Sequence, residues 1–188
     1  MSWSRAFHVP ITTPDGLMLR TLRASCASGT EKLLPIAHQL ENEGIYWFEE
    51  PIPHEDYETC AAIARELRVP VQIGENFNGP EGMLPALIAR ASDFVMPDVA
   101  RIGGVSGWMQ ASALAAAKGI EMSSRLMPEI SAQLLSATPT AHWLEYVDWA
   151  DALLKEPLRI VDGKVLTSQR PGSGIAWDED KIRKLETI

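Results

Sequence analysis

The chain has 188 residues, 17 of them basic and 25 acidic, and a formal net charge of −8. This length is enough for one well-packed core but is short of the roughly 250 residues of a complete eight-fold β/α barrel. The acidic balance argues against a nucleic acid or an anionic membrane as partner, and no apolar run approaches the roughly 18 residues that would span a bilayer.

Residues 1–30 carry only weak structural signals. Polar residues and proline interrupt residues 1–11, so we expect no signal peptide there, and only residues 17–19 are typical of a strand. The two cysteines of the chain, Cys26 and Cys60, have neither disulfide nor metal-site spacing, as in proteins of a reducing compartment. We therefore predict a cytoplasmic protein whose first 30 residues are set apart from the rest.

From residue 31 onward, helical and strand patterns alternate. Helices are expected from residue 28 or 30 to about 43, after His54, from Pro80, after the Gly103-Gly104 loop and over 130–137. Apolar runs between them predict strands at 46–49, 69–74, 94–96 and 120–123, with a further strand at 142–147. Segments 158–161 and 164–167 flank Asp162-Gly163, a strong signal for a two-residue β-hairpin. The chain therefore divides into 1–30, a β/α unit over 31–157, and a hairpin and tail over 158–188.

The first four predicted strands each lead to a charged residue. These residues are Glu49, Glu75, Asp98 and Arg125, at regular intervals along the sequence. A repeated strand, charged tip and helix is how a parallel β/α barrel presents chemistry at one face. Carboxylates on strand tips suit a hard divalent ion, Mg²⁺ rather than Zn²⁺, because no His or Cys lies among them. The alternative is that each acid caps the following helix or pairs with a surface base.

Three further features are candidates for the site. Asn76, beside Glu75, is placed to orient or bind a substrate, although such a residue alone is more often part of a loop. Glu145 is a candidate acid, because a carboxyl group in an apolar mouth has a raised pKa. The Gly103-Gly104 loop can bind an anion through its N–H groups but lacks the spacing of a P-loop. Packing or turn geometry is its expected role, and an unrelated phosphate-binding barrel is the weaker alternative.

The chain resembles the C-terminal barrel of the enolase superfamily, most closely the mandelate racemase subgroup. The resemblance runs from about residue 44 to about 158, with a weaker match from Glu31 and through the tail. It rests on WFEEP at 47–51, GEN at 74–76, MPD at 96–98, IGGVSGW at 102–108, MSS at 122–124 and TPTAHWLE at 138–145. It implies an α/β fold, a partial TIM-type barrel of roughly the last five strands plus the C-terminal hairpin tail, with the capping domain absent.

Enzymes of this family bind Mg²⁺ and remove the proton α to a substrate carboxylate. The resemblance implies that Glu49 and Glu75 are two of three metal ligands, and that Asp98 pairs with a catalytic histidine. It makes Glu145 the acid that hydrogen-bonds the developing enediolate. Arg101 stands where the family often has a lysine and is a substrate-binding candidate. The implied partner is a small hydroxy acid or sugar acid, and the family habit predicts a symmetric homo-oligomer.

The chain also departs from the family pattern. Arg125 stands where the catalytic histidine should be, and a guanidinium, with a pKa above about 12, cannot serve as a general base. It is expected instead to pair with Asp98 or to bind a substrate carboxylate. The third metal ligand is missing, with Arg20 or Arg23 in its neighbourhood, and the strand that carries the opposite base, a lysine, is absent.

These departures lead to two hypotheses. The first is a racemase or dehydratase whose activity is impaired in this chain, which we expect to be an N-terminally truncated or frameshifted member of the family. The second is a non-catalytic remnant or partner module that packs on a complete homologue. The open edge expected where the earlier strands of the barrel are missing motivates this alternative.

Overall fold

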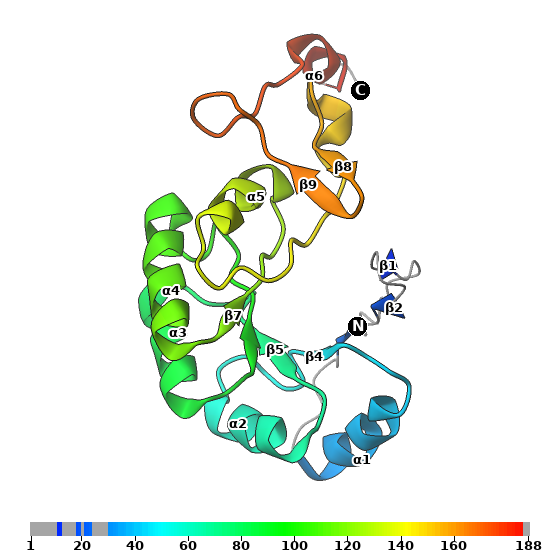
Figure 1. The fold of residues 1–188 in the computed structure, drawn as a ribbon, viewed down its shortest axis with the longest axis vertical. Coiled ribbons are helices and arrows are strands. Elements are labelled where there is room, and N and C mark those ends of the chain that lie inside the picture. Colours follow the sequence, from blue (N-terminus) through cyan, green and yellow to red (C-terminus); the bar gives the residue numbers. More distant parts are fainter. Residues whose placement is uncertain (1–10, 13–17, 20, 24–29, 186–188) are drawn as a thin grey trace.

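A five-stranded parallel sheet with helices along its outer side forms the body of the protein (Figure 1). The computed structural model describes residues 11–12, 18–19, 21–23 and 30–185. The strands lie in chain order and are β3 (Thr21–Arg23), β4 (Trp47–Glu49), β5 (Val71–Ile73), β6 (Phe94–Val95) and β7 (Glu121–Met122). The helices between them are α1 (Thr30–Glu41), α2 (Tyr57–Glu66), α3 (Gly79–Ala89) and α4 (Gly104–Lys118). The predicted alternation of strand and helix is confirmed.

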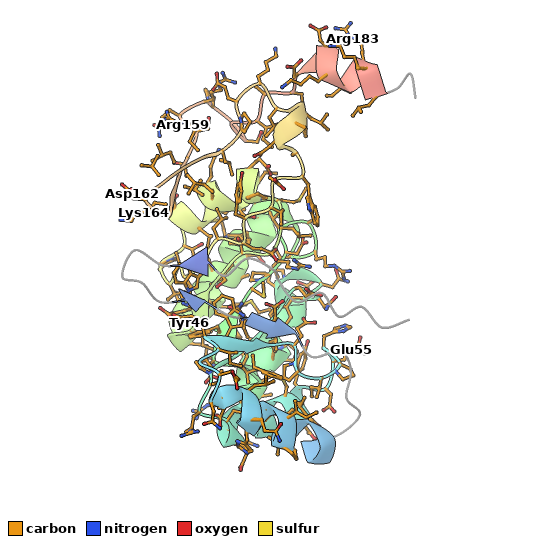
Figure 2. All side chains as sticks on the ribbon, turned by 90° about the vertical axis from the view of Figure 1, so that its right-hand side faces the viewer. Tyr46, Glu55, Arg159, Asp162, Lys164 and Arg183 are labelled. Atoms are coloured by element: carbon orange, nitrogen blue, oxygen red, sulfur yellow. The ribbon has the colours of Figure 1, made fainter. Side chains whose placement is uncertain are left out.

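Smaller elements complete the described part of the chain. They are the antiparallel pair β1 (Ile11–Thr12) and β2 (Met18–Leu19), α5 (Pro128–Ser136), the 3₁₀ turn η1 (Asp151–Leu153), β8 (Arg159–Val161), β9 (Lys164–Leu166) and α6 (Glu179–Leu185). Strands β8 and β9 pair in antiparallel fashion across Asp162 and Gly163, whose φ angles are 49° and 71°. The predicted hairpin is confirmed, and Figure 2 shows Asp162 and Lys164 at the outer edge of the molecule.

Strand β3 corrects the sequence prediction for the N-terminal segment. Within residues 1–30 the sequence predicted a strand only at 17–19, yet β3 pairs in parallel with β4, with Arg23 opposite Glu49. The strand predicted at 17–19 corresponds to β2, and Leu17, Arg20 and Cys26 lie outside the described residues. The sequence signal was weak because the regularity of so short a strand comes from its neighbour in the sheet rather than from intrinsic propensity.

The segment after α5 corrects a second prediction. Residues 142–147 were expected to form a strand, but the structure has only an isolated bridge, between Met122 and Ala141. The N–H of His142 donates to the Met122 carbonyl at 3.0 Å, and the N–H of Ser124 donates to the Trp143 carbonyl at 2.9 Å. The segment therefore lies along the edge of β7 and closes it without forming a regular strand.

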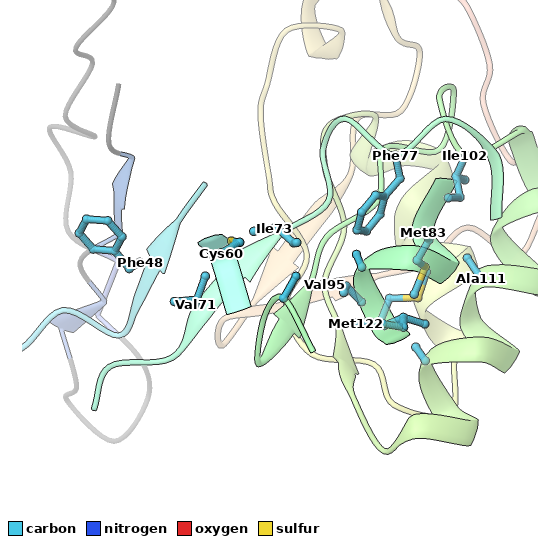
Figure 3. Packing of buried hydrophobic residues seen from close by; sticks show 14 of the residues in the cluster. Phe48, Cys60, Val71, Ile73, Phe77, Met83, Val95, Ile102, Ala111 and Met122 are labelled. Atoms are coloured by element: carbon cyan, nitrogen blue, oxygen red, sulfur yellow. The ribbon is translucent and has the colours of Figure 1, made fainter. Parts of the chain in front are cut away.

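The core lies between the sheet and the helices. The strand residues in it are all at most 3% exposed: Phe48, Val71, Ile73, Val95 and Met122. Figure 3 shows them beside Cys60 of α2, Met83 of α3 and Ala111 of α4. Cys60 is a free thiol whose pKa is raised by burial to about 12. In the part of the chain that the structure describes, none of the helices has the length and apolar character needed to cross a bilayer.

Side chains on the other face of the sheet form a polar network. Gln72 is fully buried, and its Oε1 accepts a hydrogen bond from Ser123 Oγ at 3.1 Å. Ser123 Oγ lies 3.4 Å from Nδ1 of His142, whose Nε2 lies 3.1 Å from the Tyr46 hydroxyl. Burial lowers the pKa of His142, which favours the neutral ring. Tyr46 precedes β4 and Glu55 follows it, so these two labels in Figure 2 lie toward the amino and carboxyl ends of that strand, respectively.

The Glu41 carboxylate at the end of α1 holds the loop between α2 and β5. Its side chain is only 4% exposed. Oε1 accepts the backbone N–H groups of Arg68 and Val69 at 2.5 and 3.2 Å, and Oε2 lies 3.0 Å from His38 Nδ1. The hydrogen bond with His38, together with those from the two N–H groups, lowers the pKa of Glu41 to about 2 against the opposing effect of burial.

We expect Glu41→Gln to lower the free energy of unfolding by about 1–2 kcal/mol at neutral pH, because an amide oxygen accepts these bonds less strongly than a carboxylate. The folded-state pKa lies below the ordinary value of 4.5, so the charged carboxylate stabilises the fold above that value. This contribution is lost as the pH falls toward 2. Urea unfolding near pH 7 and at about pH 3 should therefore show a smaller gap between wild type and variant at the lower pH.

The exposed Glu43, two residues further on, provides the control. Glu43→Gln should leave stability unchanged at either pH. A gap between wild type and Glu41→Gln that is the same at both pH values would show that the charge of Glu41 does not stabilise the loop.

Candidate active site

Three glutamates and one arginine meet at the carboxyl ends of the strands. Glu49 ends β4, Glu75 follows the end of β5, and Arg125 follows the end of β7. Glu145 comes from the segment that lies along β7, where its N–H donates to Ser124 Oγ at 3.1 Å. Because the strands are parallel, these positions share one edge of the sheet, the edge at which β/α barrels carry their chemistry.

Arg125 is the centre of this group. Its Nε donates to Glu75 Oε2 at 2.8 Å, and its Nη1 donates to the two oxygens of Glu145 at 2.6 and 2.8 Å. The side chains of Arg125, Glu75 and Glu145 are 21%, 10% and 16% exposed. Burial opposes the charged guanidinium, but the hydrogen bond to Glu145 and the nearby negative charges raise the pKa of Arg125 above its usual value.

Glu49 lies within the electrostatic reach of the same group. Burial raises the pKa of Glu49 to about 7; the negative charges of Glu145 and Glu75 act in the same direction. A hydrogen bond from Trp47 Nε1, at 3.3 Å from Glu49 Oε2, and the charge of Arg125 only partly offset these effects. The pKa of Glu49 is therefore raised chiefly because water is excluded from the carboxylate, and only secondarily because two other acids lie near it.

Asn76 organises two of the carboxylates. Its amide Nδ2 donates to both oxygens of Glu50, at 3.2 and 3.0 Å, and to Glu75 Oε1 at 3.3 Å. Glu50 is buried, and its φ of 40° turns the chain sharply after β4. The sequence predicted that Asn76 orients a ligand; in the described structure it orients the acids that would contact one.

Asp98 and Arg101 lie in the loop after β6. The Asp98 carboxylate accepts the backbone N–H groups of Ala100 and Arg101 at 2.7 and 3.2 Å, so it shapes its own loop. The backbone of Asp98 bridges to that of Arg125. Of the two partners that the sequence left open for Arg125, the side chain of Asp98 is not the one observed, since the guanidinium is bound by Glu75 and Glu145. The side chain of Arg101 is exposed.

The sequence carried weaker signals for the parts of the site that depend on backbone turns. Leu126 and Met127 both have left-handed backbone conformations, with φ of 51° and 45°. This turn directs the Leu126 N–H to Glu145 Oε2 at 2.6 Å. The acid Glu50 was likewise not singled out, and its position directly before Pro51 was the available signal. The Gly104 N–H donates to the Val99 carbonyl at 2.8 Å, in keeping with a turn role for that loop.

The donor chemistry of Glu49 and Glu75 fits Mg²⁺, which prefers carboxylate oxygens. The raised pKa of Glu49 comes mainly from burial, and the charges of Glu145 and Glu75 add to it, so a nearby cation would favour the ionised form of Glu49. Among the described side chains, however, no group of three His, Cys, Asp or Glu residues is placed to hold a metal ion. The residue opposite Glu49 in the sheet is Arg23. The described residues therefore offer two carboxylate ligands, one of which Arg125 already binds.

The Enolase C-terminal domain-like family matches residues 23–181 of this chain, most of its length. The chain belongs to this family. The resemblance to the enolase superfamily that the sequence motifs indicated is thereby confirmed. The match also extends beyond the predicted unit of 31–157, into β3 on one side and into the tail on the other.

Enzymes of known activity are among the relatives. The L-talarate/galactarate dehydratase of Salmonella typhimurium is 31% identical over 153 residues, which are 81% of this chain and 38% of the dehydratase. The D-galactarolactone cycloisomerase of Agrobacterium fabrum is 30% identical over 160 residues, 74% of this chain and 41% of the cycloisomerase. This chain thus spans about two fifths of the length of these curated relatives.

A solved structure supports the fold class. An enolase from Bradyrhizobium, crystallised with magnesium and mandelic acid, superimposes with a TM-score of 0.83 at 40% sequence identity. The superposition covers 88% of this chain and 46% of that enzyme. The prediction of a partial TIM-type barrel is confirmed, and so is the prediction of Mg²⁺ as the metal that accompanies this fold in its structural neighbours.

Proposed function

We propose that this chain forms part of the active site of a Mg²⁺-dependent enzyme that removes the proton next to the carboxylate of a small hydroxy acid or sugar acid. The observation that carries the proposal is the arrangement of Glu75, Glu145 and Glu49 around Arg125 at one edge of the sheet. The relatives support the substrate class, because one is named for talarate and galactarate and another was crystallised with mandelic acid.

Each residue of the site has a proposed role. Glu49 and Glu75 would hold Mg²⁺ through carboxylate oxygens, and the bound ion supplies electrostatic stabilisation for the negative charge that develops when the α-proton leaves. Asn76 keeps Glu75 oriented. Arg125 provides a fixed positive charge for the substrate carboxylate, with Glu145 holding it in place. Arg101, in the loop shaped by Asp98, is a candidate for a further contact with the substrate.

The proposed activity is impaired in this chain. The guanidinium of Arg125 stays protonated, so it binds an anion but does not accept the α-proton as imidazole would. Its ion pairs with Glu75 and Glu145 also neutralise charge that a metal and a substrate would use. A cytoplasmic location and a homo-oligomeric assembly remain predictions from the sequence.

The test is exchange of the α-proton in deuterated water, followed by proton NMR with galactarate and with mandelate in the presence of MgCl₂. We expect slow exchange in which solvent takes the α-proton in place of a protein base, and a fall of about a hundredfold or more in Glu49→Gln, because that change removes a proposed ligand of the ion that stabilises the developing negative charge. The control is Glu55→Gln, which removes an exposed carboxylate (87% exposed) from the loop after β4 and should leave exchange unchanged. Equal exchange in Glu49→Gln and wild type would contradict the proposed role of Glu49.

The second candidate function is a non-catalytic module that packs on a complete homologue. The two ion pairs of Arg125 favour it, because they give this edge of the sheet a stable arrangement that needs no ligand. Absence of exchange with either acid, together with binding of the chain to a complete homologue in a sizing experiment, would support this candidate over the enzyme.

A further inference from the structure

Two nitrogens of the Arg125 guanidinium are bound to acids of the proposed active site. Its Nε is bound to Glu75 at 2.8 Å, and its Nη1 is bound to Glu145 at 2.6 Å. Charge-assisted bonds of this length between partly buried groups are among the stronger polar contacts in proteins. The guanidinium therefore already binds Glu75, one of the two carboxylates that we propose as metal ligands.

Hydrogen bonds of the residues on either side of Arg125 fix the position of Glu145, which binds the guanidinium. The preceding residue, Ser124, makes two hydrogen bonds to the neighbouring segment. Its N–H donates to the Trp143 carbonyl, and its Oγ accepts the N–H of Glu145. The following residue, Leu126, donates its own N–H to Glu145 at 2.6 Å from a left-handed conformation. Ser124 therefore holds the backbone of Glu145, Leu126 holds its carboxylate, and that carboxylate in turn binds Nη1 of Arg125.

Both oxygens of Glu75 are engaged in this arrangement. Oε2 accepts from Arg125, and Oε1 accepts from Asn76 Nδ2 at 3.3 Å. A divalent ion that binds Glu75 must compete with the guanidinium for this carboxylate, and the two cations also repel each other in a partly buried setting where charge interactions are strong. Arginine cannot relieve the repulsion by losing its proton, as histidine or lysine could.

We infer that Arg125 is an internal cation that competes with Mg²⁺ for Glu75, and that it sets the metal affinity of this chain. The inference rests on the proposed metal site at Glu49 and Glu75. The site then has two alternative states: in one the guanidinium of Arg125 binds Glu75, and in the other the metal ion binds Glu75. Replacing Arg125 by a neutral residue should therefore strengthen binding of Mg²⁺, although the substitution removes two ion pairs from the folded protein.

The test is calorimetric titration of MgCl₂ alone into the full chain, with no substrate present. We expect Arg125→Gln, which keeps an amide donor for Glu145 but no charge, to bind Mg²⁺ about tenfold or more tightly than wild type. Arg125→Lys, which keeps the charge, should bind no more tightly than wild type. The control is Arg183→Gln, which removes an arginine from an exposed ion pair on α6 and should leave the affinity unchanged.

Circular dichroism establishes that each variant is folded, and Arg125→Met replaces Arg125→Gln if the latter is not. If wild type binds Mg²⁺ and the neutral variants bind it no more tightly, Arg125 does not compete and the inference fails, while the proposed metal site stands. If neither wild type nor the folded neutral variants bind Mg²⁺, the proposed metal site itself fails and the inference fails with it. Only a gain in affinity confined to the neutral variants supports the inference.

Discussion

Replacing Gly107 by alanine is expected to destabilise the fold by about 3 kcal/mol or more, because the added methyl group has no space and displaces backbone. A Cβ atom at this position would lie 1.8 Å from the carbonyl oxygen of Ile102 and 2.7 Å from its carbonyl carbon. Ile102 is fully buried, and so is Trp108, the neighbour of Gly107 in α4. The loop from β6 therefore cannot move aside without disturbing the core around α4.

The measurement is urea unfolding followed by circular dichroism, beside the variant Gly104→Ala. Gly104 has a φ of 68°, but a Cβ atom added there would meet nothing within 4 Å, so only backbone strain of about 1 kcal/mol is expected. The comparison separates a steric clash from a general loss of glycine at the start of α4. If the two variants were equally stable, the close approach of Gly107 to Ile102 would not be a constraint on the fold.

Replacing Glu145 by alanine is expected to lower the free energy of unfolding by about 2–3 kcal/mol, which is less than for a fully buried pair because both side chains keep some contact with water. The change removes the partner of Arg125 Nη1 and of the Leu126 N–H and leaves the guanidinium with Glu75. Thermal or urea unfolding at neutral pH measures the loss. The control is Asp180→Ala, whose ion pair with Arg183 is exposed and should contribute almost nothing.

A double variant sharpens this prediction. Glu145→Ala combined with Arg125→Met should lose less stability than the sum of the two single variants, because each single change already removes the contact between the two side chains. If the double variant loses the sum of the two single effects, then Arg125 and Glu145 do not stabilise each other. The ion pair between Arg125 and Glu145, with its 2.6 Å distance, would then contribute no coupling energy to stability.

The regular elements of the body could be predicted from the sequence because each carries a local pattern. The apolar runs that became β4, β5, β6 and β7 are bounded by turn residues, and the helices between them have apolar faces that the core confirms. The hairpin at Asp162-Gly163 was predictable for the same reason, since its turn needs two residues that tolerate positive φ. Strand β3 and the segment 142–147 were not, because their form depends on the strand beside them.

The acids of the candidate site were also predictable, but their partners were not. The positions of Glu49, Glu75 and Glu145 follow from where strands end, and that Arg125 carries a permanent charge follows from its chemistry. The sequence left two partners open for Arg125, Asp98 or a substrate carboxylate. The left-handed turn at Leu126 and Met127 helps bring Glu145 to the guanidinium, and such a turn at two residues other than glycine has little local signal.

The sequence by itself determined that this protein is an α/β chain of the enolase superfamily, with carboxylates at successive strand ends, because apolar periodicity and motif spacing are properties of the linear chain. Only the tertiary structure decided that Asn76 holds Glu50 and Glu75, that Asp98 shapes its own loop, and that Arg125 binds two glutamates. The physical reason is that an ion pair depends on distances of a few ångströms between side chains. The paired residues are 20 and 50 positions apart in the sequence. The distances between them are set by how β4, β5 and β7 are arranged side by side in the sheet.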